Sequence, residues 1–330
     1  MTRCRVDESL DRVVNDGMSF PLGVYPVEEV VPQQGYTMEF EASDGDDEGG
    51  DWEEWPDRYV FDVVITSDRL ASLCRQLFAL LPGRVFPILD YIGHDAYREI
   101  DPYIAYELVG QDRILDAMRR FKDFFFEDGM VGFGAMCDDP FIYVFVDEHK
   151  IVTVRVTPDF KPRVEKILSA FDLEEVEEPR GADACAHEHR GVLLAPPDRP
   201  DLLAGEEIIE KLRDDWRLIL NVDAEQNLDD EGNELGQTDW RCLVRCASEN
   251  APQERYMEVL LRAANLAEAE EIASEVASGQ IDRDSAGAWV DLIIIAGDRL
   301  RPEQTIELLA DANASESAIP EHGVLSVRWL

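Results

Sequence analysis

The stretch that decides the fold runs from residue 58 to residue 83 and reads RYVFDVVITSDRLASLCRQLFALLPG. Its first part, Tyr59 to Ile65, is rich in β-branched and aromatic residues, which is typical of a strand. Ser67 or Asp68 then offers a helix N-cap, and apolar residues follow at spacings of three and four until Pro82-Gly83. A strand that leads into an amphipathic helix predicts mixed α and β structure.

The same two patterns continue toward residue 173. Strands are predicted at 85–89, 103–109, 130–136, 141–147 and 151–156, and helices at 111–128 and 160–171. Glu148-His149-Lys150 is expected to join the last two strands as a tight hairpin. The pair Gly132 and Gly134 lies within a strand, whereas a dinucleotide site needs its glycine turn to open a helix. Hairpins mixed with helices therefore favour an α+β class, with helices packed on one face of the sheet.

A second series of elements follows residue 190. Strands are expected at 192–194, 216–222, 240–247, 256–263, 288–296 and 323–330, and helices at 206–214, 266–278 and 302–313. We expect 216–222 and 240–247 to pair as antiparallel strands across a polar connection in which Gly232 has a positive φ. Cys242 and Cys246 share one face of their strand and are expected to be small core side chains. The series predicts a second sheet-plus-helix α+β domain.

Charge divides the chain into segments. The 330 residues include 31 Lys plus Arg and 71 Asp plus Glu, for a net charge of −40. Residues 58–173 contain 14 basic and 19 acidic residues, so most of the excess of acidic residues lies outside this segment. We therefore expect an acidic, partly flexible N-terminal segment interrupted by Pro and Gly (1–57), a near-neutral α+β domain (58–173), an acidic linker (174–190) and an acidic α+β domain (191–330).

The same composition excludes some classes of partner. No cluster of Lys and Arg is present to neutralise phosphates, so direct nucleic-acid binding is not expected. The apolar runs are shorter than the roughly 20 residues of a membrane-spanning helix, and no signal peptide is visible, so we expect a cytoplasmic protein. The six scattered cysteines lack a C-x-x-C pair, which indicates reduced thiols.

The acidic stretch at 44–57 gives the favoured functional hypothesis. Asp46, Asp47 and Glu48 are followed by Trp52 and Trp55, which either anchor the stretch on its own domain or contact a partner. The pattern disfavours a calcium loop, because Trp55 stands where the twelfth-position Glu should be. We therefore expect a non-enzymatic interaction or regulatory protein whose acidic surface binds a basic protein partner. Salt adaptation alone is an alternative explanation of the acidity.

A second hypothesis is a metal-dependent hydrolase, and two segments could serve it. In the segment from Asp90 to Asp101, His94 with Asp95 could act as a general base and its orienting carboxylate, although an irregular connection is the simpler interpretation. In Cys185-Ala186-His187-Glu188-His189, extended structure would place Cys185, His187 and His189 on one face as zinc or iron ligands.

The metal hypothesis requires a further donor, and His322, Asp138 and Asp139 are suitable by type. The plainer interpretation is a linker with two incidental histidines, in which case no cofactor is expected. A third hypothesis, a small-ligand sensor at the hinge of residues 174–183, follows from the domain organisation alone.

Overall fold

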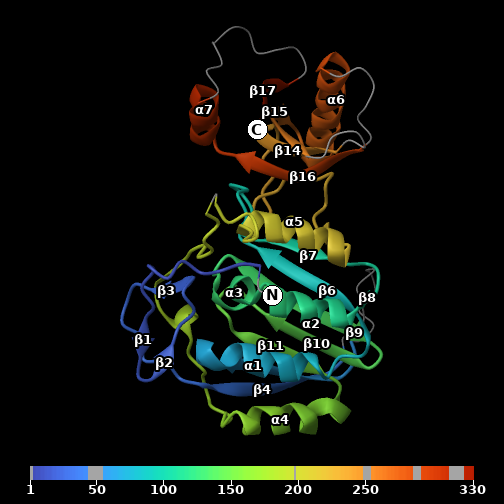
Figure 1. The fold of residues 1–330 in the computed structure, drawn as a ribbon. Coiled ribbons are helices and arrows are strands. Elements are labelled where there is room, and N and C mark those ends of the chain that lie inside the picture. Colours follow the sequence, from blue (N-terminus) through green and yellow to red (C-terminus); the bar gives the residue numbers. More distant parts are fainter. Residues whose placement is uncertain (1–2, 44–54, 197, 248–253, 285–290, 312–322) are drawn as a thin grey trace. The chain divides into compact units, whose positions relative to one another are not determined.

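The computed structural model describes residues 3–43, 55–196, 198–247, 254–284, 291–311 and 323–330. Two compact units are present: residues 1–91 with 102–221, and residues 92–101 with 222–330. All paired strands of the sheets are antiparallel, and helices pack against them, so the chain is an α+β protein (Figure 1). This confirms the fold class expected from the hairpins.

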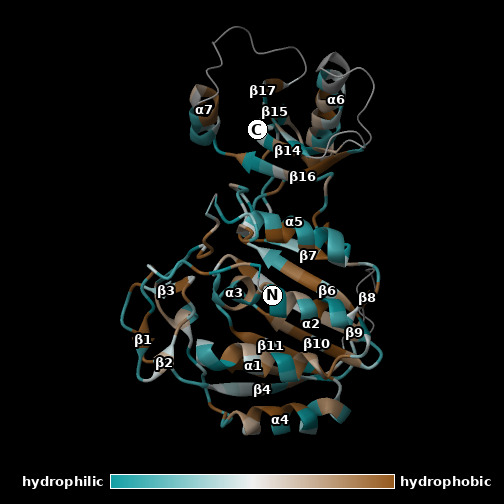
Figure 2. Cartoon of the chain, viewed as in Figure 1, coloured by the Kyte–Doolittle hydropathy of each residue, from teal (hydrophilic) through white to brown (hydrophobic). Residues whose placement is uncertain are grey.

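The first unit is built on a nine-stranded sheet with strand order β13-β7-β6-β9-β10-β11-β5-β4, and β8 pairs with β6. The strands are β4 (Gly35–Glu41), β5 (Arg58–Val64), β6 (Arg84–Tyr91), β7 (Asp101–Ile104), β8 (Val109–Gly110), β9 (Val131–Asp138), β10 (Phe141–Val146), β11 (Val152–Val156) and β13 (Ile219–Leu220). Its central strands are largely hydrophobic (Figure 2). Every second residue of β9 to β11, such as Phe133 and Val144, is buried against the helices.

Five helices supply the other side of this core: α1 (Ser67–Phe78), α2 (Gln111–Arg120), α3 (Lys122–Glu127), α4 (Lys161–Ala170) and α5 (Gly205–Trp216). The helix expected at 111–128 is divided at Phe121, whose φ of −112° and ψ of 39° are not helical. Phe125 lies at the centre, with its ring centroid 4.5 Å from that of Phe133 and 6.0 Å from that of Trp216. A short 3-10 turn (Pro158–Phe160) precedes α4.

Two small sheets lie outside the large one. The first pairs β1 (Val14–Asn15) with β2 (Met18–Ser19), and the second pairs β3 (Val24–Pro26) with β12 (His187–His189). A 3-10 turn (Ala182–Ala184) comes just before β12. A small apolar cluster that includes Phe20 and Val24 supports these strands.

The second unit has a four-stranded sheet of order β16-β14-β15-β17. The elements are β14 (Thr238–Ala247), β15 (Arg255–Ala263), α6 (Leu266–Asp284), β16 (Asp291–Leu300), α7 (Pro302–Asp311) and β17 (Val324–Trp329). Cys242 and Cys246 are fully buried on one face of β14, as expected, and the Cys242 Sγ lies 3.9 Å from the Ala269 carbonyl oxygen of α6. Gly232 has the expected positive φ, at 82°.

Residues 191–221 differ most from the sequence expectation. We expected them in the second domain, but they belong to the first unit, because Leu212 and Trp216 of α5 enter its core. The strand expected at 216–222 does not pair with 240–247: Trp216 ends α5, and β13 pairs with β7. Helical spacing continues through Trp216 and outweighs the strand propensity of the residues after it. Residues 192–194 contribute only an isolated bridge between Leu193 and Val6.

In the described part of the chain, no helix is both long enough and apolar enough to cross a membrane.

Candidate metal centre

Three histidines of the first unit meet at one point. His187 and His189 occupy alternate positions of β12, where they stand opposite Pro26 and Val24 of β3. Because side chains alternate along a strand, both rings lie on the same face. The third ring belongs to His149, at the tip of the hairpin between β10 and β11. Two segments 40 residues apart in sequence therefore supply one cluster.

A tight hairpin holds His149 in position. The Asp147 backbone N–H donates to the Ile151 carbonyl oxygen at 3.0 Å, and the Asp147 carboxylate accepts from the Ile151 N–H at 2.7 Å. Lys150 closes the turn with a φ of 67°, a left-handed conformation that costs a residue with a Cβ about 1–2 kcal/mol. Its side chain is buried, and its ammonium group donates to the Val131 carbonyl oxygen of β9. The buried lysine thus ties the hairpin tip to the sheet.

The Nε2 atoms of the three rings are close to one another. The Nε2 of His189 lies 3.1 Å from that of His187 and 3.3 Å from that of His149. The ring planes are steeply inclined, at 73° to 80°, with centroids 4.7 to 5.0 Å apart. In a tetrahedral site with Zn–N bonds of about 2.0–2.1 Å, neighbouring nitrogens are about 3.3–3.4 Å apart. The two distances from the His189 Nε2 are close to this spacing, and the ligand atoms of all three rings lie within 4.8 Å of one another.

Backbone carbonyls fix the tautomer of two rings. The Nδ1 of His187 lies 2.8 Å from the Cys185 carbonyl oxygen, and the Nδ1 of His189 lies 2.8 Å from the Gly129 carbonyl oxygen. A carbonyl oxygen only accepts, so both Nδ1 atoms must donate their N–H. In the neutral rings, both Nε2 atoms then carry a lone pair directed toward the centre of the cluster. This is the arrangement that orients histidine ligands around a metal.

The third ring has carboxylates around its Nδ1. Glu148 lies 3.2 Å and Asp147 3.6 Å from the Nδ1 of His149. Burial alone would lower the pKa of His149, but hydrogen bonds to Asp147 and Glu148 raise it to about 10. Burial alone would raise the pKa of Glu148, but the hydrogen bond and the charge of His149 outweigh burial and lower this pKa to about 2. The cluster therefore has a negatively charged partner beside one ligand, a carboxylate–histidine pair of the kind found around zinc.

A pKa of about 10 keeps His149 protonated at neutral pH in the metal-free chain, so an ion would bind all three nitrogens only by displacing the Nε2 proton of His149. One proton on an Nε2 can be donated to a single neighbouring nitrogen, whereas a metal ion bonds all three nitrogens at once. Burial and the nearby charges of His149 and His187 lower the pKa of His189, which favours its neutral, ligating form. The His149 side chain is 21% exposed, so solvent reaches the cluster. A cation held here would keep a coordination position for water.

A contact between two glycines sets the position of the Gly129 carbonyl. A Cβ on Gly129 would lie 1.9 Å from the Gly23 carbonyl oxygen, so the two backbones would have to separate. Gly129→Ala should therefore displace the acceptor of the His189 Nδ1 and weaken zinc binding about 10- to 100-fold, although no ligand is removed. Calorimetric titration with zinc measures this loss. Gly83→Ala, with open space around the new methyl group, should bind zinc as the wild type does, and equal losses in both variants would contradict the prediction.

The other residues of the metal hypothesis lie elsewhere. The Cys185 Sγ is 3.4 Å from the Ala182 carbonyl oxygen and packs against the small apolar cluster, so this residue contributes its backbone carbonyl to the site. Asp138 ends β9 and Asp139 follows it, about 23 Å along the strand from Val131 at the other end. His322 is outside the described residues. Among the described residues, the ligand atoms that converge are those of His149, His187 and His189, with Asp147 and Glu148 beside them.

The candidates in the segment from Asp90 to Asp101 separate into two places. Asp90 ends up in β6, opposite Gly132 of β9, and burial followed by the charge of Glu148 raises its pKa to about 6. Its carboxylate is therefore within electrostatic range of the histidine cluster. His94 and Asp95 belong to the second unit, where His94 is exposed and Asp95 is buried.

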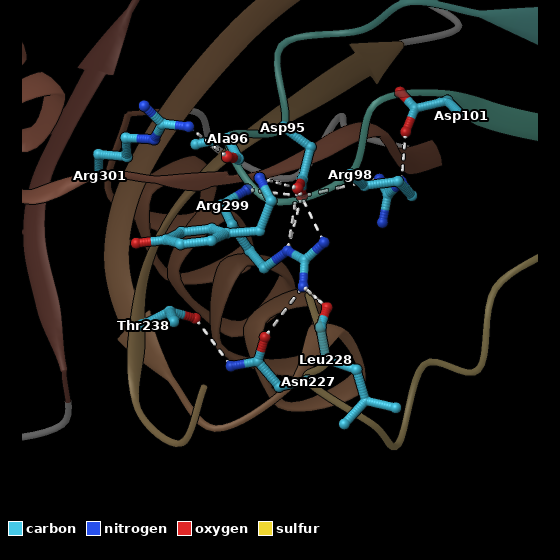
Figure 3. A network of polar contacts seen from close by, with 10 residues as sticks. Asp95, Ala96, Arg98, Asp101, Asn227, Leu228, Thr238, Arg299 and Arg301 are labelled. Atoms are coloured by element: carbon cyan, nitrogen blue, oxygen red, sulfur yellow. Dashed lines mark hydrogen bonds and ion pairs between the residues drawn. The ribbon is translucent and has the colours of Figure 1, made fainter. Parts of the chain in front are cut away.

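Asp95 is the centre of a network in the second unit (Figure 3). Its carboxylate accepts from the Arg299 guanidinium at 2.8 to 3.0 Å and from the backbone N–H of Arg299 at 3.0 Å. The same guanidinium donates to Asn227, whose amide donates in turn to Thr238 at 3.0 Å. Arg98 bridges Asp95 to Asp101. These contacts fasten residues 92–101 onto the second unit, which is a structural role for Asp95.

Only one of the residues proposed to bind a partner can be placed. The Trp55 ring packs against Phe141 and Tyr143, with centroids 5.3 and 6.1 Å away, and Arg58 and Arg155 stack on it. This residue anchors its segment on the first unit. The remaining four, Asp46, Asp47, Glu48 and Trp52, lie outside the described residues.

Comparison with known proteins does not identify this chain: no family model, no curated protein and no solved structure matches it.

Proposed function

We propose that the chain binds one zinc-class divalent ion through the Nε2 atoms of His149, His187 and His189 and uses the ion to activate water for hydrolysis. The observation that carries the proposal is the convergence of three Nε2 atoms whose rings are held from behind through Nδ1. Imidazole ligands suit zinc, copper, iron and nickel. The spacing of the His189 Nε2 from the other two nitrogens favours zinc within that group.

The number of protein ligands supports a catalytic role for the ion. Structural zinc sites are closed by four protein ligands, whereas catalytic sites combine three with a water molecule. The ion lowers the pKa of its bound water to about 7 and so supplies hydroxide at neutral pH. In this chain, the three imidazoles would hold the ion and Glu148 would orient His149. Asp90, half-buried and within range of Glu148, is the candidate for moving a proton to the leaving group.

Hydrolysis of 4-nitrophenyl acetate tests the catalytic part of the proposal. The zinc-loaded full chain should hydrolyse the ester at least about tenfold faster than the metal-free chain, because hydroxide then becomes available at neutral pH. His187→Ala in the same zinc buffer should give the metal-free rate, and His94→Ala should retain the wild-type rate. If the zinc-loaded chain hydrolyses the ester no faster than the metal-free chain, the catalytic part of the proposal is wrong and only the metal-binding part remains.

The binding of a basic protein partner stays a prediction. Most of the residues proposed for it lie outside the described part, and Trp55 packs on its own unit. Pull-downs at low salt test this hypothesis directly, since contacts between exposed charges weaken as salt is added.

A further inference from the structure

The first unit carries a second feature, on its helices, that the metal site does not use. A cavity of about 370 Å³ opens among α1, α2 and α3. Its floor is apolar and consists of Ala71, Leu115, Met118 and Phe126. The cavity is within the range of small-ligand pockets, about 300–1,000 Å³. It is a space for the apolar part of a small molecule.

Three cationic side chains surround this floor: Arg75 from α1, Arg119 from the end of α2 and Lys122 from the start of α3. Arg119 is paired with Asp116 at 2.6 Å. Arg75 and Lys122 are exposed, and neither forms an ion pair with any carboxylate in the described part of the chain. The chain has a net charge of −40, so two cations that form no ion pair give the edge of this apolar cavity a charge opposite to that of the whole chain.

From this combination we propose that the groove between α1, α2 and α3 binds a single-chain amphiphilic anion, a carboxylate with a hydrocarbon tail. The tail would displace water from the cavity and lie against Leu115, Met118 and Phe126, and each buried CH₂ group of the tail contributes to affinity. The headgroup would lie between Arg75 and Lys122, with the pairing of Arg119 and Asp116 unchanged. The cavity volume suits one hydrocarbon chain rather than a peptide helix, whose diameter is about 10 Å.

Calorimetric titration of the full chain with decanoate, below its micellar concentration, tests the proposal. One decanoate per chain should bind. Decyltrimethylammonium, which has the same tail and the opposite charge, should bind on the order of tenfold more weakly or not at all. The double variant R75E/K122E should bind decanoate on the order of tenfold more weakly than the wild type, because two favourable contacts with the headgroup become repulsive.

A matched control separates this local effect from a change in net charge. The double variant R163E/K166E reverses two exposed cations on α4 and should bind decanoate as the wild type does. A variant that fills the groove, Ala71→Leu, keeps every charge and should weaken decanoate and decanol alike. Equal binding of the two decyl compounds, or no loss in R75E/K122E, would overturn the proposal. Binding of an acidic amphipathic peptide without binding of decanoate would overturn it too.

Discussion

Adding zinc to the metal-free chain should raise its melting temperature by ~5–10 °C. An ion that binds only the folded state stabilises it by about 2.7 kcal/mol when its concentration is 100 times its dissociation constant. For a unit of about 200 residues, each kcal/mol moves the melting temperature by about 2–4 °C. The ion would join the β10–β11 hairpin to β12, two segments that lie apart in the sequence. Differential scanning calorimetry at fixed zinc concentration measures the shift.

Four alanine variants show whether the shift arises at the histidine cluster. The shift in melting temperature should disappear in each of His149→Ala, His187→Ala and His189→Ala. Replacing a residue that only hydrogen-bonds to a ligand typically costs about 10- to 100-fold in metal affinity, and removing a ligand should cost more. His94→Ala is the matched control: this histidine is exposed, lies in the second unit and should leave the shift unchanged. A shift that survives in any of the three cluster variants would contradict the site.

Asp95→Ala should destabilise the second unit by ~3–5 kcal/mol, since breaking a buried ion pair from one side leaves a buried charge without compensation. The Asp95 side chain is fully buried and that of Arg299 is 5% exposed. Without the carboxylate, the guanidinium would keep only neutral acceptors such as Asn227. Denaturation by urea, followed by tryptophan fluorescence, measures the loss, because Trp240 of β14 lies in the same unit.

An exposed ion pair provides the control for this measurement. Asp201 pairs with Arg199 at 2.8 Å, but its side chain is 62% exposed. Asp201→Ala, which lies in the first unit, should therefore leave the unfolding of the second unit almost unchanged. If Asp95→Ala costs no more than Asp201→Ala, the network in Figure 3 does not hold residues 92–101 on the second unit.

Local patterns account for most of the secondary structure. Strands β5, β9, β10 and β11 and helices α1 and α4 lie where residue periodicity placed them, because each buries one face against the same core. The strand predicted to begin at Trp216 was wrong, because the short apolar run from Leu218 to Leu220 had suggested a longer strand than β13. Only the first unit's core shows that Trp216 is the last inward residue of a helix.

The candidate site was half predictable. Alternation along an extended segment placed His187 and His189 on one face, and β12 has this geometry. His149 was predicted only as a hairpin residue. Its neighbours Asp147 and Glu148 could have indicated a ligand, because carboxylates next to a histidine can orient its ring. Its approach to β12 depends on how the small sheet packs beside the large one, and no local pattern encodes that. For the same reason the partner of Asp95, 204 residues away, could not be foreseen.

X-ray absorption at the zinc edge of the zinc-loaded full chain shows which atoms bind the ion. We expect three imidazole nitrogens and one oxygen, all at about 2.0–2.1 Å from the zinc. His187→Ala, treated in the same way, should retain no zinc after gel filtration. A sulfur atom at about 2.3 Å would assign the ion to a cysteine site instead, and a wild-type chain that retains no zinc would contradict the site altogether.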